Sequence, residues 1–344
     1  MVRGSSERYC AQGAVPLVNV EGSARECGRW LGHSWAESLR RAAADRPARS
    51  LPWWKDRRFK NLVDQLAPHL PPLYRGLAHG AGVSENHVGT RAPIADEGCT
   101  SFAIQPPAAL DRQPISGQTK DGSVCRIHQR QVLRLKMTDA PSALTVTEAG
   151  LVFGFGFVAG GCAIFRNSLW AGAGTGQLPF AAWGLLALHC PTVEQVVKLT
   201  KDYGVRKGFH TTVADEYGGV VGIEMTAAGV AFLKPVRGIY THANAVVGDR
   251  KAVRHERTKP PFTRADSVHR QRRLAQMLRE HRGRMTAQLA FNALADHDGY
   301  PVSICRHQSA AATTSAAIVA EPTRRRLHVC RGAPCQNWSQ TYCL

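Results

Sequence analysis

The 344-residue sequence predicts an α+β protein built from layers of sheets and helices. Up to about residue 90 the chain has a mainly helical pattern. From Cys99 onward it consists of short β-branched or alternating segments separated by glycine-rich breaks. Runs of strands, then helices, then strands again favour a layered α+β domain over regular βαβ units.

The first part of the chain contains two helical stretches. Residues 21–42 are amphipathic, and Ser23 is a suitable N-cap. Residues 60–82 also have a helical pattern, which we expect to be broken by prolines 68, 71 and 72 and to end at Gly80 or Gly82.

The second part of the chain alternates between strands and helices. We expect two helices within residues 179–204, the second starting at Thr192, and a basic helix over residues 264–280 followed by a further helical stretch. The segments with a strand pattern are residues 99–105, 132–137, 142–150, 151–167, 211–225, 229–236 and 313–332.

The composition is that of a soluble globular protein, with 44% hydrophobic and 20% charged residues. No apolar run approaches 18 residues, and the N-terminus lacks the apolar core of a signal peptide, so we expect a cytoplasmic protein without a membrane segment. The ten cysteines form no CxxC pair, and no HExxH occurs among the 14 histidines. We therefore expect free thiols, no metal site and no cofactor.

The formal net charge is +18, and residues 250–284 alone carry 12 Lys/Arg against three Asp/Glu. Such a block is able to bind an anionic partner. It is also typical of a solvated loop and helix face, which is the interpretation that we favour. Because no aromatic residues alternate with the charges, nucleic acid is not the expected partner.

The Gly98–Cys99 junction is a candidate site of self-cleavage, because Cys99 begins the strand-rich part of the chain. If Cys99 attacks the carbonyl of Gly98, the amide becomes a thioester, and hydrolysis leaves Cys99 with a free α-amino group. One residue then holds a thiol nucleophile and an amine of pKa about 7.7–8.0 to act as base. Glycine tolerates strained backbone geometry, and Thr100 and Ser101 leave room beside the thiol. A buried structural cysteine is the alternative.

A set of ordered motifs supports the first interpretation. The chain resembles the acyl-coenzyme A:isopenicillin N acyltransferase family, which are cysteine N-terminal nucleophile hydrolases. The motifs that carry the resemblance are ARECGRWLG (residues 24–32), LYRGLAHGAGVSENHV (73–88), EGCTSFA (97–103), SGQTKD (116–121), GLVFGFGFVAGGCAIFRNSL (150–169), THANAV (241–246) and DHDGYPVSICRH (296–307), followed by GAPC near the C-terminus.

The resemblance implies a four-layer αββα sandwich with a helical propeptide segment. It also implies self-cleavage before Cys99 into an α-chain of residues 1–98 and a β-chain of residues 99–344, which stay associated. The expected activity is hydrolysis of an N-acyl amide through an S-acyl-Cys99 intermediate. Acyl transfer from acyl-coenzyme A in a biosynthetic pathway, or a non-catalytic relative that binds an anionic partner, remain alternatives. The sequence leaves the oligomeric state open.

The resemblance also implies roles for single residues. Cys99 corresponds to the nucleophile, Asp121 to an acidic residue near it, and Asn244 to the side-chain amide that donates to the oxyanion. Arg306 corresponds to the active-site arginine. We further expect supporting roles for three residues near these positions, namely Arg91, Thr100 and Ser303.

Three positions depart from the family pattern. Thr119–Lys120 replaces an Asn–aromatic pair, Val158 replaces an Asn in the glycine-rich strand pair, and Phe209 stands where the penicillin-forming enzyme has a serine. We expect these changes to reshape the acyl pocket. Phe153, Phe155 and Phe157 alternate along the same glycine-rich stretch and are candidates for the core or for that pocket.

Overall fold

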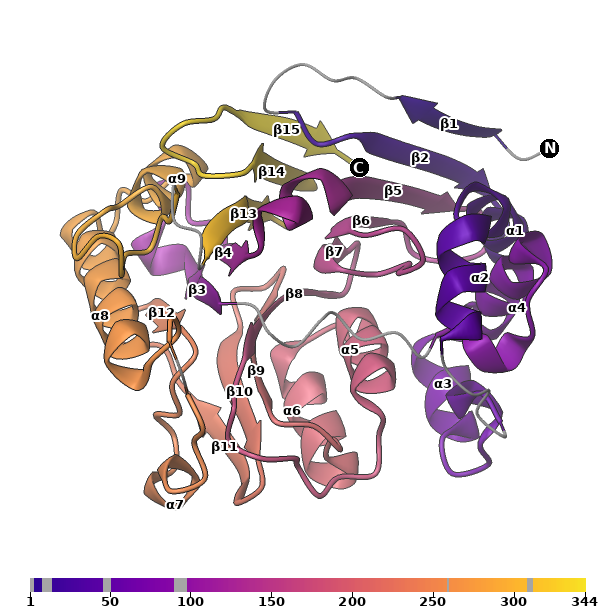
Figure 1. Ribbon diagram of the computed structural model, residues 1–344, viewed down its shortest axis with the longest axis horizontal. Coiled ribbons are helices and arrows are strands. Elements are labelled where there is room, and N and C mark those ends of the chain that lie inside the picture. Colours follow the sequence, from indigo (N-terminus) through magenta and orange to yellow (C-terminus); the bar gives the residue numbers. More distant parts are fainter. Residues whose placement is uncertain (1–2, 8–13, 46–50, 90–97, 259, 308–311) are drawn as a thin grey trace.

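A computed structural model describes residues 3–7, 14–45, 51–89, 98–258, 260–307 and 312–344. Two β-sheets face each other, with helices on both outer faces, so the layers follow the order αββα (Figure 1). The predicted α+β sandwich is therefore confirmed. Among the described residues, no helix has the length and apolar character needed to cross a lipid bilayer.

The larger sheet has nine strands, and all neighbours are antiparallel except one parallel pair. Its strands, in spatial order, are β1 (Arg3–Glu7), β2 (Leu17–Gly22), β5 (Gln131–Met137), β6 (Ala143–Thr147), β7 (Phe155–Val158), β8 (Cys162–Ser168), β9 (Phe209–Asp215), β10 (Val220–Thr226) and β11 (Gly229–Leu233).

The smaller sheet has six strands, which are all antiparallel to their neighbours. In spatial order they are β12 (Ile239–His242), β3 (Gly98–Ile104), β4 (Ile115–Gly122), β13 (Thr313–Glu321), β14 (Arg326–Arg331) and β15 (Ser339–Cys343).

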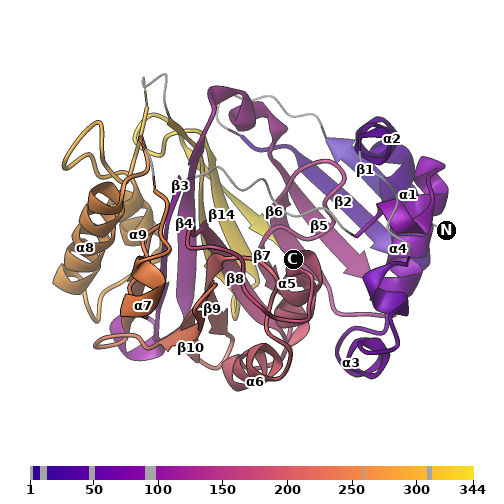
Figure 2. The same cartoon turned by 60° about the horizontal axis from the view of Figure 1, so that its bottom comes forward.

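Helices cover each sheet on its outer face (Figures 1 and 2). The six-stranded sheet is covered by α8 (Arg264–Glu280) and α9 (Ala287–Leu294), and α7 (Arg250–Val253) precedes them. The nine-stranded sheet is covered by α5 (Phe180–His189) and α6 (Val193–Tyr203), together with α1 (Ala24–Ser34), α2 (Ala36–Ala44), α3 (Lys60–Leu66) and α4 (Leu70–Ala81).

The helical predictions agree with these elements except that residues 21–42 form two helices, α1 and α2, instead of one, and except at two prolines. Ser23 caps α1, and its side chain accepts a hydrogen bond from the Glu26 amide. Pro71 and Pro72 do not break the second stretch as expected, because they lie in the first turn of α4, where no intrahelical donor is needed. Gly82 ends α4 in the left-handed conformation.

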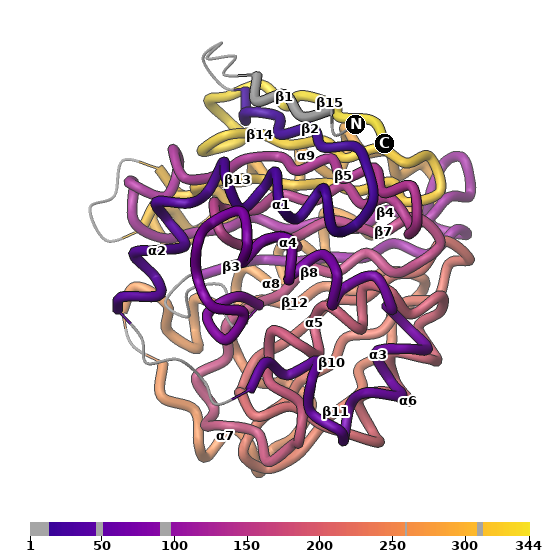
Figure 3. The backbone as a smooth tube through the Cα atoms, turned by 90° about the vertical axis from the view of Figure 1, so that its right-hand side faces the viewer, coloured from indigo at the N-terminus to yellow at the C-terminus, as the bar shows by residue number. Residues whose placement is uncertain are grey.

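The N-terminal segment is joined to the rest of the protein by backbone pairing as well as by helices. Strand β2 lies parallel to β5 inside the nine-stranded sheet. Helices α1 and α4 pack side by side next to that part of the sheet (Figure 3). Their backbones approach so closely that a Cβ on Gly76 would lie 2.1 Å from the carbonyl oxygen of Arg25.

Three apolar layers hold the sandwich together. One lies between the sheets and contains Phe155, Phe157 and Ile318. A second joins the six-stranded sheet to α8 and α9, and the largest joins the nine-stranded sheet to α1–α6. The strand that begins at Gly98 therefore lies in the middle of the protein, between a helical layer and the second sheet.

Candidate active site

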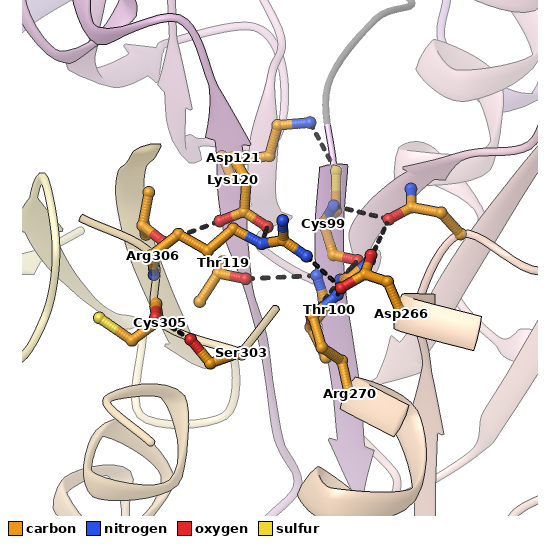
Figure 4. Close-up of polar contacts among 12 residues, drawn as sticks. Cys99, Thr100, Thr119, Lys120, Asp121, Asp266, Arg270, Ser303, Cys305 and Arg306 are labelled. Atoms are coloured by element: carbon orange, nitrogen blue, oxygen red, sulfur yellow. Dashed lines mark hydrogen bonds and ion pairs between the residues drawn. The ribbon is translucent and has the colours of Figure 1, made fainter. Parts of the chain in front are cut away.

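The thiol of Cys99 lies against the ammonium group of Lys120. Strands β3 and β4 pair so that Gly98 lies opposite Asp121 and Cys99 lies opposite Lys120. Directly opposed residues project from the same face of a sheet, so the thiol and the lysine are on one side. Lys120 Nζ donates to Cys99 Sγ at 3.0 Å, and it also lies 4.8 Å from the centre of the Phe155 ring (Figure 4). Both residues are buried.

The Gly98–Cys99 peptide lies at the start of strand β3, and Cys99 is hydrogen-bonded through both its backbone amide and its backbone carbonyl. The Cys99 amide donates to Asn244 Oδ1 at 3.0 Å, and the Cys99 carbonyl accepts from Arg270 Nη1 at 2.9 Å. A Cβ on Gly98 would lie 2.2 Å from the Phe262 ring. Glycine is thus required here for space, whereas the sequence suggested a need for unusual backbone geometry.

Asn244 follows strand β12 and is oriented by three hydrogen bonds. Its Oδ1 accepts from the Cys99 amide and from Arg270 Nη2, the second also at 3.0 Å. Its Nδ2 donates to the carbonyl oxygen of Ser168 at 3.0 Å. Asn244 thus meets the Cys99 amide through its oxygen, while the Nδ2 group that the family resemblance assigns to the oxyanion contacts Ser168.

Four buried charged side chains form a cluster on the other face of β3 and β4. Arg270 of α8 pairs with Asp266 one turn earlier, with Nη2–Oδ2 at 2.9 Å and Nε–Oδ1 at 3.1 Å. Arg306 also donates to Asp266, and it approaches Asp121 with Nε–Oδ2 at 4.0 Å. Two arginines thus face two carboxylates, the balance that lets charge remain in a buried site.

Asp121 is only partly satisfied within this cluster. Its Oδ1 accepts from Thr314 Oγ1 at 2.8 Å, whereas its Oδ2 and the Nε of Arg306 have no hydrogen-bond partner among the described residues. Burial raises the pKa of the Asp121 carboxyl, and the nearby Arg306 and Arg270 oppose that shift. A β-bulge after Thr314, opposite the step from Lys120 to Asp121, turns the threonine toward the carboxylate.

Arg306 is fixed through both its backbone and its side chain. Its amide donates to Thr314 Oγ1 at 2.9 Å, and its carbonyl accepts from the Thr314 amide at 2.8 Å. Its guanidinium lies 5.2 Å from the Phe262 ring, the ring that touches Gly98. Burial lowers the pKa of the Arg306 guanidinium, with a smaller contribution from Arg270 in the same direction.

The three expected supporting residues have different places. Thr100 Oγ1 accepts from Arg270 Nη1 at 2.6 Å, so it belongs to the charged cluster. Ser303 Oγ donates to the carbonyl of Cys305 at 2.6 Å and shapes the loop that leads to Arg306. Arg91 lies outside the described residues.

A small pocket of about 60 Å³ opens beside Lys120 on the thiol side of the sheet. Its aromatic walls are Phe155, Trp170, Phe180 and Phe209, and Arg166 and Lys207 line it as well. The guanidinium of Arg166 lies 5.2 and 5.3 Å from two of these rings, and its Nε has no hydrogen-bond partner among the described residues. Burial lowers the pKa of Arg166 to about 10.

The residues that depart from the family pattern lie in different environments. Phe209 and Lys120 line the pocket, whereas Thr119 accepts a hydrogen bond from the Thr100 amide at 3.3 Å. Val158 belongs to the apolar layer beneath α1–α6.

The three alternating phenylalanines also lie in different environments. Phe155 lines the pocket and Phe157 lies in the apolar layer between the sheets. Phe153 packs against His189 of α5, with ring centres 5.4 Å apart. Only the middle residue of the three therefore reaches the pocket.

Sequence reasoning missed three residues of this site, namely Lys120, Asp266 and Arg270. Lys120 was noted only as a departure from the family pattern. The other two lie in the basic segment, whose charges were assigned to solvent or to a partner. A signal was available, because Asp266 and Arg270 continue the four-residue spacing of Leu274 and Leu278, and all four are buried on one face of α8.

Comparison with known proteins identifies the family of the chain. The sequence model of the acyl-coenzyme A:6-aminopenicillanic acid acyl-transferase family matches residues 148–336, more than half of the chain. The chain belongs to this family. These are N-terminal nucleophile enzymes, so the resemblance inferred from the motifs is confirmed. The match includes Asn244, Ser303 and Arg306, while Cys99 and Asp121 precede it.

A solved structure gives the same fold. A mutant of the conjugated bile acid hydrolase from Clostridium perfringens superimposes with a TM-score of 0.50 and 12% identity, over 72% of this chain and 97% of that chain. A variant of the same hydrolase gives a TM-score of 0.48, also with 12% identity and the same coverage. Comparison with curated protein sequences gave no match.

Proposed function

We propose that this chain is a self-cleaving cysteine amidohydrolase. It cuts its own Gly98–Cys99 peptide and then acts on N-acyl amides through an acyl thioester on Cys99. The observation that carries the proposal is the environment of the junction: the thiol contacts an ammonium at 3.0 Å, and hydrogen bonds hold both the amide and the carbonyl of Cys99. A buried structural cysteine also needs partners for its backbone amide and carbonyl, but it has no need of a buried ammonium against its thiol.

In the proposed self-cleavage, Cys99 Sγ attacks the carbonyl carbon of Gly98. The C–S bond forms, the C–N bond breaks, and the thiol proton goes to the leaving nitrogen, which becomes the α-amino group of Cys99. Water then hydrolyses the thioester, leaving a carboxylate on Gly98 and a free thiol. Lys120 favours the attacking thiolate, because a cation beside the sulfur stabilises its negative charge.

In the proposed turnover, the new α-amino group takes the proton of the Cys99 thiol. The sulfur attacks the carbonyl of the substrate, the acyl–nitrogen bond breaks, and the leaving amine receives that proton. Water then releases the acid and restores the thiol. Asp121 Oδ2 has no hydrogen-bond partner among the described residues, and Asp121 occupies the strand position opposite Gly98. In the proposed turnover this oxygen accepts a hydrogen bond from the α-amino group once the peptide is cut.

The pocket favours an acyl group that has apolar or aromatic surface and an anionic substituent. Its three phenylalanines provide the apolar walls. Arg166 and Lys207 provide positive charge, and the unpaired Nε of Arg166 is a donor without an acceptor among the described residues. A carboxylate on the substrate would satisfy that donor.

Acyl transfer is the second candidate function. The family is named for an enzyme that moves an acyl group from acyl-coenzyme A to an amine. The positive side chains that line the pocket suit such a donor, whose phosphates are anionic. Transfer and hydrolysis share the S-acyl-Cys99 intermediate and differ only in whether an amine or water accepts the acyl group.

A trapping experiment tests the common intermediate. Purified protein is mixed with N-acyl amides and acyl thioesters, quenched in acid, and its mass is measured under denaturing conditions. The proposal predicts an adduct of the mass of one acyl group, which hydroxylamine removes. Adding a primary amine and measuring N-acyl amine against free acid then separates transferase from hydrolase.

Cys125→Ala is the matched control, because Cys125 is a free and exposed cysteine on another part of the surface. It should form the adduct at the rate of the wild type, and Cys99→Ala should form none. An adduct that persists in Cys99→Ala would contradict the assignment of the nucleophile. Absence of any adduct across both donor classes would favour a protein that has kept the fold for binding.

A further inference from the structure

Two histidines of the α9–β13 connection, which also carries Arg306, lie close to a cysteine of the β14–β15 connection. His297 follows α9, His307 precedes β13, and Cys335 lies between β14 and β15. Each offers one ligand atom, and these three atoms all lie within 4.8 Å of one another. His297 Nε2 and His307 Nε2 are 2.9 Å apart.

A second thiol adjoins this group. Cys305 Sγ lies 3.6 Å from Cys335 Sγ, and Cys305 is buried while Cys335 is exposed. The four side chains thus provide two imidazole nitrogens and two sulfurs. This is the Cys₂His₂ donor set of tetrahedral zinc sites, and it is too soft for magnesium or calcium.

Two of the donor spacings, one between the sulfurs and one between the nitrogens, are close to those of a filled tetrahedral site. With Zn–S bonds of about 2.3 Å and Zn–N bonds of about 2.0–2.1 Å, neighbouring sulfurs are about 3.8 Å apart and neighbouring nitrogens about 3.4 Å apart. The 3.6 Å between the sulfurs and the 2.9 Å between the nitrogens are each within about half an ångström of those values. Cys305 is not among the three residues whose ligand atoms lie within 4.8 Å of one another, so its thiol would turn toward the imidazoles to complete the site.

One neighbouring group is able to support the required tautomer after an amide flip. The amide nitrogen Nε2 of Gln336 lies 3.3 Å from His307 Nδ1, and the two ends of such an amide are interchangeable. With the amide oriented so that its oxygen faces the ring, it accepts the Nδ1 proton and leaves the Nε2 lone pair for a metal.

We propose that His297, His307 and Cys335 bind a zinc ion, with Cys305 as the fourth ligand. The sequence predicted no metal site, since these residues form no short linear motif. The site would be structural, because four protein ligands leave no open position for water or substrate.

The proposed site has a consequence for Arg306, which lies between two of the ligands in the chain. Cys305 and His307 anchored to one ion would fix the loop whose arginine pairs with Asp266 and approaches Asp121. Zinc would thus act as a positioning element for the charged cluster. This consequence rests on the proposed function, whereas metal binding itself does not.

Metal analysis tests the site directly. The tag-free protein is dialysed against chelator, given zinc, freed of excess metal and analysed for zinc per chain. We expect one equivalent in the wild type and in Cys343→Ser, an exposed free cysteine outside the cluster. His297→Ala and Cys335→Ser should bind at least tenfold more weakly. Both positions are partly or fully exposed, so these variants should still fold, which circular dichroism checks.

Cobalt serves as a spectroscopic probe of the ligands. The cobalt-loaded protein should show tetrahedral visible bands and thiolate-to-cobalt charge transfer in the near ultraviolet. The charge-transfer intensity should fall by about half in Cys305→Ser, because one of two thiolates is lost. Zinc binding with no change in Cys305→Ser would overturn the assignment of that ligand.

Two results would overturn the metal site as a whole. One is a wild-type protein that retains no zinc or cobalt at micromolar concentrations. The other is a Cys305–Cys335 disulfide in protein purified without reductant, seen as a mass 2 Da lower and a thiol count smaller by two. Either result leaves the trapping experiment on Cys99 unaffected, so failure of this site and failure of the proposed function are distinguishable.

Discussion

Replacing Lys120 with methionine tests the role of the group closest to the thiol. Methionine keeps most of the side-chain volume and removes the charge that lies 3.0 Å from Cys99 Sγ. Two opposite charges at that distance attract by about 5 kcal/mol at an effective dielectric constant of about 20. Desolvation of the buried ammonium offsets much of this energy. A net loss of about 1.4–2.8 kcal/mol corresponds to self-cleavage that is about 10–100-fold slower at pH 7.

The assay follows the disappearance of the intact chain by mass over time at several pH values. In Lys120→Met we expect the pH of half-maximal cleavage rate to rise by about 1–2 units, since loss of a neighbouring cation disfavours the thiolate. Lys207→Met is the matched control, because it removes another lysine that lines the same pocket. An unchanged pH profile in Lys120→Met, or an equal shift in Lys207→Met, would refute the reasoning.

Three further predictions concern packing, the charged cluster and pH. Gly76→Ala places a methyl group 2.1 Å from a carbonyl oxygen of the facing helix and should lower the free energy of unfolding by about 1–3 kcal/mol in a denaturant titration. Arg270→Met should abolish self-cleavage and cost about 3–5 kcal/mol of stability, because it leaves a buried carboxylate short of a partner; a cleaving, fully stable variant would contradict this.

The pH prediction concerns His69 and His189, whose Nε2 atoms lie 2.9 Å apart in the interior. Burial lowers the pKa of His69 to about 4 and that of His189 to about 3, from 6.5. The two histidines bind protons at a higher pH in the unfolded chain than in the folded protein, so acid favours unfolding. Their contribution to the free energy of unfolding is complete above about pH 6.5 and is lost as the pH falls from there toward about 4 for His69 and about 3 for His189. At pH 5 the loss is about 2 kcal/mol for each histidine. The double variant His69→Phe, His189→Leu should show a correspondingly weaker dependence between pH 7 and 5; an unchanged dependence would contradict the assignment.

The layered fold was accessible from the sequence because its signals are local. The change from helical periodicity to β-branched alternation at Cys99 coincides with the start of β3, and the basic helix occupies residues 264–280 as predicted. The position of Pro71 and Pro72 in the first turn of α4 was not predicted. A short stretch of sequence does not distinguish a proline that ends one helix from a proline that begins the next. Their role depends on where the helix starts.

The charged cluster was less accessible because its members come from distant strands and helices. Asp121 and Arg306 were expected near the nucleophile through the family resemblance alone. Lys120 requires the β3–β4 register, which places it opposite Cys99. Arg270 requires the docking of α8 on the six-stranded sheet. The number of charges in residues 250–284 suggested a solvated or partner-binding segment. The sequence does not distinguish the buried Arg270 from its exposed neighbours, because they are the same residue type.

The most direct test of the account is the intact mass of the purified chain beside Cys99→Ala, under denaturing conditions. The account predicts two wild-type fragments of 98 and 246 residues and a mutant that stays at 344 residues. The longer fragment should begin with a free N-terminal cysteine. A wild-type chain that remains whole after prolonged incubation, or a cut at any other peptide bond, would contradict the proposal that Cys99 generates itself as the N-terminal nucleophile.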